Sequence, residues 1–283
     1  MKQDDITWIC DQPLFSGESR KPILWALWLP FGIIVGLLRI LALVIYSFVM
    51  QAFPTRVKKK AYRIFLRMIG INVRVNMTPE QVGQHTDGCV VASNHISVFD
   101  HFTALGMPYA TLMVDSVGGV AGKISGFLLF KGSGASYWLV ADLKQMMAKF
   151  REWKKSPSGT ALYVTPEATI NNGRGLYRFR PDFLVRGRPV VPVAISIHLP
   201  FGLSAHPFYG NGVMRFIRLL ISPTIRFDMH YLPAIPGYES AAKSGNQQEY
   251  ADRVQQAIAT QLAIPATHFT REDKYAYRDG SKA

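Results

Sequence analysis

The sequence predicts an α/β fold, a mixed central sheet flanked by helices, with a membrane-inserted two-helix segment at the N-terminus. Short apolar runs, either continuous or alternating, recur along the chain and are separated by runs with helical spacing. This is the pattern of strands that alternate with helices. An apolar stretch over residues 20–53 comes before them and is long enough to enter a bilayer. We therefore expect a membrane-anchoring segment over residues 1–53 and one large domain over residues 54–283.

Three features of the apolar stretch favour a bent insertion into one leaflet. Pro30 and Gly32 lie inside it and favour a break in a helix. Arg39 also lies inside it, and a charge at the centre of a bilayer is costly. Basic residues flank both ends, which by the positive-inside tendency places both ends in the cytoplasm. The alternative is one tilted span from which Arg39 reaches the interface.

Residues 55–70 carry apolar side chains at helical spacing with Lys and Arg between them. They predict a basic amphipathic helix that lies on anionic headgroups, or else a surface helix with a solvated charged face. The net charge of +13 over 283 residues fits an anionic partner. No nucleic-acid-binding motif occurs, so we expect no nucleic-acid partner. Cys10 and Cys89 form no CxxC, and no zinc-like cluster occurs, so we expect a reducing compartment and no metal site.

Polar or chain-turning residues follow three of the expected strands. Functional groups gather in loops at such ends, which makes Asn94-His95, Pro166-Glu167 and the stretch after Lys131 candidates for a site. The last of these follows GFLLF, residues 126–130, which is taken as a strand. The other strands are expected over residues 71–77, 88–94, 109–116, 160–167, 188–196 and 224–235, and the other helices from near Ser97, over 140–156 and over 249–264.

The stretch VVASNHISVFDHF, residues 90–102, ends a buried strand on His95 and brings Asp100 five residues later. Ser97 can cap a helix, and Ser-x-x-Asp resembles a capping box. A carboxylate in the first turn can also fold back onto one imidazole nitrogen, so that the other nitrogen acts as a base. On a continuous helix the two residues would lie about 140° apart. The pair therefore requires a strand–turn–helix junction.

These residues carry a family resemblance. NHISVFD resembles the His-x4-Asp motif of the glycerolipid acyltransferases, which include the 1-acylglycerol-3-phosphate, glycerol-3-phosphate and lysophosphatidylcholine acyltransferases. YVTPEATINNGRG resembles the family's Pro-Glu-Gly-Thr block, with Ala168 in place of the usual Gly. RPVVPVAIS resembles its Val-Pro-Val strand. GFLLFKGSG is a poorer match to its Gly-x-x-Phe-x-x-Arg block, because Lys131 is the nearest cation.

The resemblance implies that residues 54–283 form a glycerolipid acyltransferase domain. His95 would be the general base, and Asp100 would fix its tautomer. Arg174, with Lys131 as a second candidate, would hold the acceptor's phosphate, and Arg178, Arg180 and Arg186 are rivals of Arg174. Glu167 would position the acceptor's free hydroxyl or order these cations. The substrate-binding residues that the resemblance implies are Lys131, Glu167, Thr169 and Arg174.

The implied reaction is acyl transfer from acyl-CoA or an acyl carrier protein to the free hydroxyl of a lysophospholipid, with 1-acylglycerol-3-phosphate as the first candidate. Lysophosphatidylcholine and glycerol-3-phosphate are alternative acceptors, and a non-enzymatic lipid-surface adaptor is an alternative function. Apart from the thioester co-substrate, no cofactor is expected. We expect the chain on a membrane, monotopic or single-span. Its domain would lie on the cytoplasmic side of a bacterial inner membrane or the endoplasmic reticulum.

Overall fold

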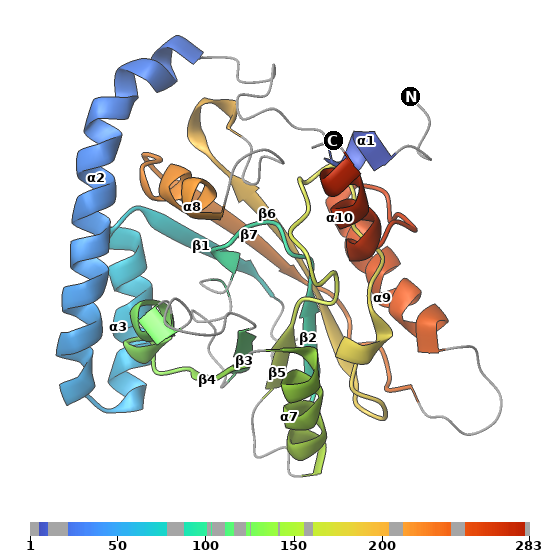
Figure 1. The fold of residues 1–283 in the computed structure, drawn as a ribbon. Coiled ribbons are helices and arrows are strands. Elements are labelled where there is room, and N and C mark those ends of the chain that lie inside the picture. The colour runs from blue at the N-terminus through green and yellow to red at the C-terminus, as the bar shows by residue number, and fades with distance from the viewer. Residues whose placement is uncertain are drawn as a thin grey trace.

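Within the described residues, seven strands form one mixed sheet in the order β1-β7-β6-β2-β5-β3-β4 (Figure 1). Strands β2 to β6 are mutually parallel, whereas β7 runs antiparallel to β6 and β1 runs parallel to β7. The strands are β1 (Ile71–Asn76), β2 (Val90–Ser93), β3 (Thr111–Asp115), β4 (Ser136–Leu139), β5 (Ala161–Val164), β6 (Val190–His198) and β7 (Ile225–Tyr231). The computed structural model describes residues 6–10, 22–77, 88–100, 103, 111–115, 123–124, 126–140, 142–155, 161–203, 212–238 and 247–280.

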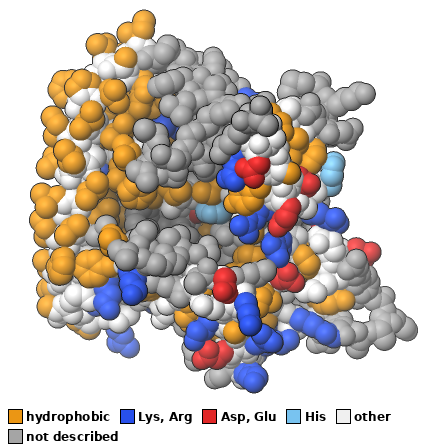
Figure 2. Space-filling model, viewed as in Figure 1, with side chains coloured by type: hydrophobic (Ala, Val, Ile, Leu, Met, Phe, Trp, Pro, Cys, Tyr) orange, Lys and Arg blue, Asp and Glu red, His pale blue; other side chains and the backbone are white. Residues whose placement is uncertain are grey.

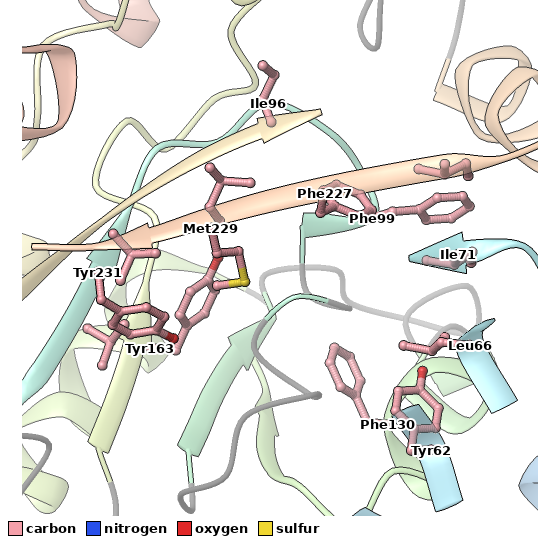
Figure 3. Close-up of a cluster of buried hydrophobic side chains, with 14 of the residues drawn as sticks. Tyr62, Leu66, Ile71, Ile96, Phe99, Phe130, Tyr163, Phe227, Met229 and Tyr231 are labelled. Atoms are coloured by element: carbon pink, nitrogen blue, oxygen red, sulfur yellow. The ribbon is translucent and has the colours of Figure 1, made fainter. Parts of the chain in front are cut away.

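Helices cover both faces of the sheet, which confirms the predicted fold class. One face packs against α2 (Pro22–Val49), α3 (Thr55–Met68) and α8 (Gly212–Leu220), and the aromatic side chains of this core are shown in Figure 3. The other face packs against α7 (Leu143–Lys155) and α9 (Gln247–Leu262). A short N-terminal helix, α1 (Ile6–Cys10), contacts the C-terminal helix α10 (Arg271–Gly280).

Strand β2 lies at the centre of the sheet because it is apolar on both of its faces. All four of its residues are buried. Side chains of a strand alternate between its faces, so Val91 joins the core beneath α3 and α8, while Val90 and Ala92 join the core beneath α7 and α9. A parallel strand covered on both sides reads as a continuous apolar run. The residues that follow β2 are therefore fixed at the middle of the sheet's edge.

The apolar N-terminal segment is one helix, α2, and the prediction of two helices within residues 20–53 was wrong. Pro30 lies inside α2 without ending it. Gly32 does not break the helix either. A Cβ atom at Gly32 would lie 2.7 Å from the carbonyl oxygen of Ile221, and one at Gly36 would lie 3.0 Å from the Ile221 side chain. The glycines therefore serve close packing of α2 on the segment between α8 and β7.

Arg39 faces the protein instead of reaching out of a bilayer. Its side chain is buried, and its guanidinium donates hydrogen bonds to four backbone carbonyl oxygens. The acceptors are the carbonyls of Ile69, Leu220, Ser222 and Pro223, at 2.6, 2.6, 2.5 and 2.8 Å. These carbonyls end α3 and α8, where helices leave such groups without partners. Arg39 thus joins α2 to the ends of two helices of the domain.

The opposite side of α2 is apolar and exposed. It forms an orange column on the left of Figure 2, with Ile23 74%, Leu27 64% and Leu37 63% exposed. Among the described residues, Ile23–Ala52 is the one helical stretch that is long and apolar enough to cross a membrane. Helix α3 forms as predicted: it buries Tyr62, Phe65 and Leu66.

The run GFLLF is helical, so its assignment as a strand was wrong. Phe127–Lys131 forms a short helix packed on α2. The ring of Phe127 contacts that of Phe48 of α2 in a tilted arrangement, with 4.9 Å between ring centroids. Continuous apolar runs of this length do not distinguish a strand from a buried helix. Strand β4 and helices α8 and α10 were not predicted. The helix expected from near Ser97 is seen at Asp100 and Thr103, while residues 101–102 and 104–110 lie outside the described residues.

Candidate active site

The end of β2 is tied to β6 by the side chain of Asn94. The Asn94 amide donates to the carbonyl of Ile195 at 2.9 Å, and the Ile195 N–H donates to Asn94 Oδ1 at 2.8 Å. These two hydrogen bonds resemble those between paired residues of neighbouring strands, except that the side-chain amide of Asn94 replaces a backbone amide. They stop the chain from continuing as a strand and start the turn that presents His95. Asn94 was predicted to lie at the strand end that forms the site, but the sequence indicated no role for its side chain.

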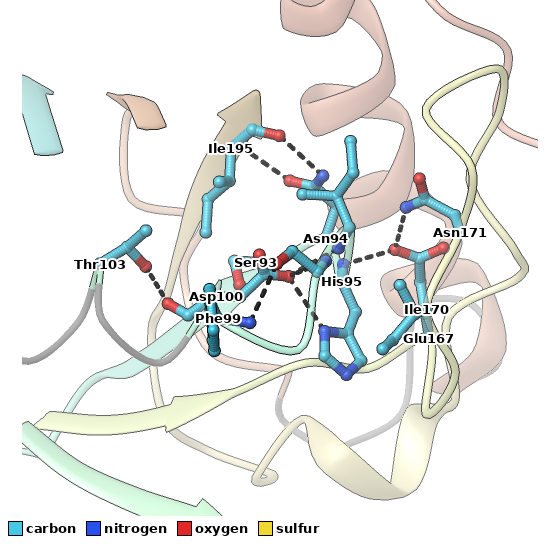
Figure 4. Close-up of polar contacts among 12 residues, drawn as sticks. Ser93, Asn94, His95, Phe99, Asp100, Thr103, Glu167, Ile170, Asn171 and Ile195 are labelled. Atoms are coloured by element: carbon cyan, nitrogen blue, oxygen red, sulfur yellow. Dashed lines mark hydrogen bonds and ion pairs between the residues drawn. The ribbon is translucent and has the colours of Figure 1, made fainter. Parts of the chain in front are cut away.

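His95 and Asp100 are brought together as predicted from their spacing. His95 Nδ1 lies 3.0 Å from Asp100 Oδ2, and in Figure 4 the other ring nitrogen points away from the carboxylate. The His95 side chain is 17% exposed and that of Asp100 is fully buried. An acceptor on Nδ1 holds the proton there, which leaves Nε2 as the basic nitrogen.

Asp100 also caps the turn, so the two interpretations of this residue hold together. The same Oδ2 atom accepts hydrogen bonds from the N–H groups of Ile96 and Ser97 at 2.6 and 3.0 Å. Ser97 Oγ in turn accepts from the N–H of Phe99 at 2.9 Å. The contact from Asp100 to the Ser97 N–H is one half of a capping box. The cap fixes the carboxylate, and the fixed carboxylate orients the imidazole.

Glu167 lies beside the His95 backbone, just after the end of the neighbouring strand β5, and is fully buried. Its Oε1 accepts from the His95 N–H at 2.7 Å and from the Asn171 amide at 2.8 Å (Figure 4). Its Oε2 accepts from the Tyr177 N–H at 2.9 Å. We expected this carboxylate to face the acceptor or order cations. In this structure it is enclosed by backbone and amide donors, so it positions the His95 backbone.

Burial of the carboxyl group raises the pKa of Glu167 to about 8, while the three donors and the charge of Lys274 act in the opposite direction. The folded chain then binds a proton that the unfolded chain releases between pH 4.5 and about 8. This contribution to stability is complete below pH 4.5 and is lost as the pH rises to about 8.

The melting temperature of the wild-type chain should therefore fall over this pH window more steeply than that of Glu167→Gln, whose side chain does not titrate. Thermal unfolding of both proteins at a series of pH values measures the difference. Parallel curves for the two would mean that Glu167 binds no extra proton in the folded state.

The loop after Glu167 is held against the His95 segment. The N–H of Asn171 donates to the carbonyl of His95 at 2.7 Å, and Asn171 itself is buried. Ala168 adopts a left-handed conformation with φ 53°, which explains why a Gly is the usual residue in the block that this loop resembles. Asn171 was missed because Asn and Gly in a loop indicate only a turn.

Thr169 is buried and is bound by the C-terminal helix. Lys274 of α10 donates to Thr169 Oγ1 at 3.2 Å and to the carbonyl of Ile170, and its ammonium lies 5.2 Å from the centre of the Tyr177 ring. Thr169 was predicted to bind substrate, whereas its hydroxyl here contacts Lys274. Lys274 was missed because one lysine in a charged helix gives no signal of burial.

For the acyl transfer that the sequence predicts, Lys274→Met should loosen the loop and raise the Michaelis constant for the acceptor more than that for the donor. Loss of the charge-assisted hydrogen bonds of Lys274 should cost about 1.5–3 kcal/mol in the free energy that holds the loop in place. Arg278→Met, on the same helix, is the matched control, and Lys274→Arg should recover part of the defect. Steady-state kinetics with each substrate varied in turn provide the measurement. Equal changes in both constants would argue against a role in positioning this loop.

Arg174 lies three residues beyond the Asn171 contact, and its backbone N–H is held by Asn172 Oδ1 at 3.0 Å. Two of its rivals have carboxylate partners. Arg178 forms two hydrogen bonds with Asp252, at 3.1 and 2.8 Å. Arg180 lies 3.4 Å from Asp182 and 3.6 Å from Glu272. Ion pairing with α9 and α10 gives Arg178 and Arg180 a structural role. Arg174 and its rival Arg186 stay predictions.

Lys131 is exposed, and its role as a substrate ligand stays a prediction. Among the contacts of described residues, none joins it to His95, Glu167 or Arg174. The following residue, Gly132, packs on α2, where a Cβ atom would lie 3.0 Å from the Tyr46 ring. Lys131 therefore lies by the C-terminal half of the apolar helix. The described residues contain no group of three or more His, Cys, Asp or Glu side chains that could hold a metal ion.

Lysophospholipid acyltransferase LPCAT4 of Xenopus tropicalis is 33% identical over 132 residues, which are 46% of this chain and 24% of that protein. Probable glycerol-3-phosphate acyltransferase 3 of Arabidopsis thaliana is 30% identical over 126 residues, 42% of this chain and 23% of that protein. The chain is similar to glycerolipid acyltransferases.

The chain is also similar to a protein whose name is not that of an acyltransferase. The lipid droplet-regulating VLDL assembly factor AUP1 of Xenopus laevis is 24% identical over 281 residues, which are 98% of this chain and 66% of that protein. The chain thus spans less than two thirds of the length of each of these relatives. No family model matches. The crystal structure of the 1-acyl-sn-glycerophosphate acyltransferase PlsC from Thermotoga maritima covers 86% of this chain and 97% of its own, at 15% identity with a TM-score of 0.48.

Proposed function

We propose that this chain transfers an acyl group from a thioester donor to the free hydroxyl of a lysophospholipid, with 1-acylglycerol-3-phosphate as the first acceptor to test. The observation that carries the proposal is the His95–Asp100 pair at the end of β2, with its fixed carboxylate and partly exposed imidazole. Similarity to lysophospholipid and glycerol-3-phosphate acyltransferases supports the reaction class. The donor is acyl-CoA or an acyl carrier protein.

In the proposed reaction His95 Nε2 takes the proton of the acceptor hydroxyl as its oxygen attacks the thioester carbonyl. The buried Asp100 carboxylate stabilises the imidazolium that forms. When the tetrahedral intermediate collapses, the carbon–sulfur bond breaks and the thiolate leaves. The imidazolium returns its proton to that thiolate, which restores neutral His95 and releases a thiol and the acylated lipid. The steps require no cysteine or serine nucleophile.

The test of this proposal is a panel of acceptors with a labelled acyl thioester and the purified full chain. The panel contains 1-acylglycerol-3-phosphate, lysophosphatidylcholine and glycerol-3-phosphate, each with acyl-CoA and with acyl carrier protein as donor. Transfer to 1-acylglycerol-3-phosphate that exceeds transfer to the other two supports the first acceptor. If transfer to lysophosphatidylcholine or glycerol-3-phosphate is faster, that compound is the acceptor, and the proposed reaction class is retained.

Arg174 is the proposed phosphate ligand of the acceptor, because a guanidinium binds a phosphate through two parallel hydrogen bonds that a lysine does not reproduce. Arg174→Lys should raise the Michaelis constant for the acceptor about tenfold or more, and change that for the donor little. Steady-state kinetics with Arg178→Ala as the neighbouring control test this. A defect confined to the donor's constant would assign Arg174 to the donor's phosphates.

A non-enzymatic role on a lipid surface is the second candidate. It is favoured by the similarity to AUP1, which extends over 98% of the chain. The His95–Asp100 pair favours an enzyme instead. Absence of transfer to every acceptor in the panel, with intact binding to lipid vesicles, would favour the adaptor.

We propose that α2 enters one leaflet and lies along the domain. Trp28, Arg39 and Tyr46 attach α2 to the domain at three points along its length. Trp28 Nε1 donates to the Ile221 carbonyl at 2.8 Å, and Arg39 Nη1 donates to the Leu220 carbonyl at 2.6 Å. The Tyr46 ring stacks on the Phe65 ring with 4.0 Å between centroids. A helix held along its length by the domain has little freedom to cross a bilayer alone. Its exposed face is the surface for lipid. The flanking basic residues support a cytoplasmic location of the domain, on a bacterial inner membrane or the endoplasmic reticulum.

A further inference from the structure

A pocket of about 640 Å³ opens at the edge of the sheet formed by β1 and β7, where the end of β6 meets them. It does not include His95, Asp100 or Glu167. Basic and neutral donor side chains line most of it. The polar residues of its lining are Arg67, Asn72, Arg74, His198, Thr224 and Arg226.

The register of the sheet explains why these side chains gather. Asn72 is paired with Arg226, Arg74 with Asp228, and Arg226 with His198. Directly paired residues point to the same face, and neighbours in sequence point to the other. The residues between them, such as Ile71 and Phe227, fill the core beneath α3. One face of this corner is therefore apolar and covered, whereas the opposite face is polar and basic.

The charge of the pocket is not balanced within it. Arg67 and Arg74 are exposed. Asp228 is the register partner of Arg74, but its ion pairs within the described residues are with Arg226 and His198. Arg226 and His198 share one acid: Asp228 Oδ2 lies 3.2 Å from Arg226 Nε and 2.9 Å from His198 Nε2. Three guanidinium groups around one pocket repel one another, and one carboxylate offsets only part of this repulsion. The combination suits an anion with several oxygens.

We propose that this pocket binds a phosphate-bearing ligand, through Arg67, Arg74 and Arg226, at a site separate from the His95 site. The ligand's phosphate comes either from an anionic lipid headgroup or from a soluble phosphate compound. Arg67 precedes Met68 on α3, and the Met68 side chain is 78% exposed. A bilayer that takes up Met68 would bring lipid phosphates close to Arg67. His198 lies three residues, about 10 Å, along β6 from Ile195, the residue bound to Asn94. The pocket and the candidate active site thus share one end of the sheet.

The site is tested by binding alone, without an acyl donor, so its failure is separate from failure of the proposed reaction. Inorganic pyrophosphate is titrated by calorimetry into the full chain in neutral detergent at low salt. Arg74→Gln/Arg226→Gln should weaken binding about tenfold or more, because each arginine supplies charge-assisted contacts. The control is Lys144→Gln/Arg151→Gln, which removes two exposed charges from α7 and should leave the affinity unchanged.

Asp228→Asn should strengthen pyrophosphate binding, whereas the arginine variant should weaken it. Misfolding of a variant would weaken binding and so would not produce this result. Asp228→Asn removes the one carboxylate beside Arg226 and His198, so pyrophosphate should bind more tightly, by about threefold to tenfold, since nearby like charges repel. Weaker or unchanged binding in Asp228→Asn would overturn the proposal that the anion sits against Arg226.

The two sources of phosphate are separated by vesicle binding. Vesicles of phosphatidylcholine alone and with phosphatidylglycerol are sedimented with each variant. A defect of Arg74→Gln/Arg226→Gln on the anionic vesicles identifies a lipid headgroup. A defect with pyrophosphate but none with vesicles identifies a soluble ligand. If the double variant matches the α7 control in both measurements, the pocket is not a phosphate site.

Discussion

Replacing His95 with alanine should lower the rate of acyl transfer by about 10²–10⁴-fold, the usual cost of losing a general base. The fold should persist, because the ring is partly exposed and contributes little to either core. The backbone contacts from His95 to Glu167 and Asn171 do not involve the ring, so they survive the change. The loss should appear in the turnover number, with vesicle binding unchanged. The measurement is single-turnover transfer with the preferred acceptor of the panel.

Two further variants give this experiment its controls. His230→Ala removes a histidine from β7 of the same sheet and should keep full activity. Asp100→Asn keeps an oxygen for the N–H groups of Ile96 and Ser97, so its melting temperature should change little. It removes the charge that stabilises the imidazolium, so its rate should fall strongly. Full activity in Asp100→Asn would reduce Asp100 to a helix cap, and near-normal turnover in His95→Ala would assign the base elsewhere.

The centre of the site could be predicted from the sequence because its geometry is local. His95 and Asp100 are separated by one turn, and the buried run before them fixes where that turn begins. Glu167 follows a second buried run, and parallel neighbours in a sheet end at the same edge. The sequence therefore placed these three residues at one edge without knowledge of the order of the strands. The sequence predicted that the Glu167 side chain binds substrate, whereas it is buried. Its burial depends on the loop that folds over it, which the sequence does not place.

The remaining contacts could not be predicted because they join distant parts of the chain. Lys274 meets Thr169 across 105 residues, and Asn94 meets Ile195 across 101 residues. No periodicity or spacing encodes such pairs. The apolar helix was misread for a related reason. Proline and glycine indicate a break when their surroundings are unknown, but here the glycines face Ile221 in a close contact.

Arg39→Ala should destabilise the folded chain by about 3 kcal/mol or more, because four backbone carbonyls would lose their common donor. The carbonyl of Leu220 ends α8, that of Ser222 follows it, and that of Ile69 follows α3, so the ends of both helices would be left with unpaired acceptors. The Arg39 guanidinium also leaves no room for a side chain at position 70, which is occupied by glycine. A Cβ atom at Gly70 would lie 2.6 Å from Arg39 Nη2, and its φ of 80° favours glycine.

Leu38→Ala is the matched control, since Leu38 is the neighbouring residue of α2 and is 59% exposed. Its truncation should change stability by a few tenths of a kcal/mol in detergent. Arg39→Lys should fall between the two, because an ammonium has three donors but no planar fork to reach four carbonyls. Chemical unfolding of the three variants in neutral detergent, followed by tryptophan fluorescence, gives the comparison. If Arg39→Ala unfolds at the same denaturant concentration as Leu38→Ala, the four hydrogen bonds do not attach α2 to the domain. The arginine would then act at the lipid surface, as the tilted-span interpretation of the sequence required.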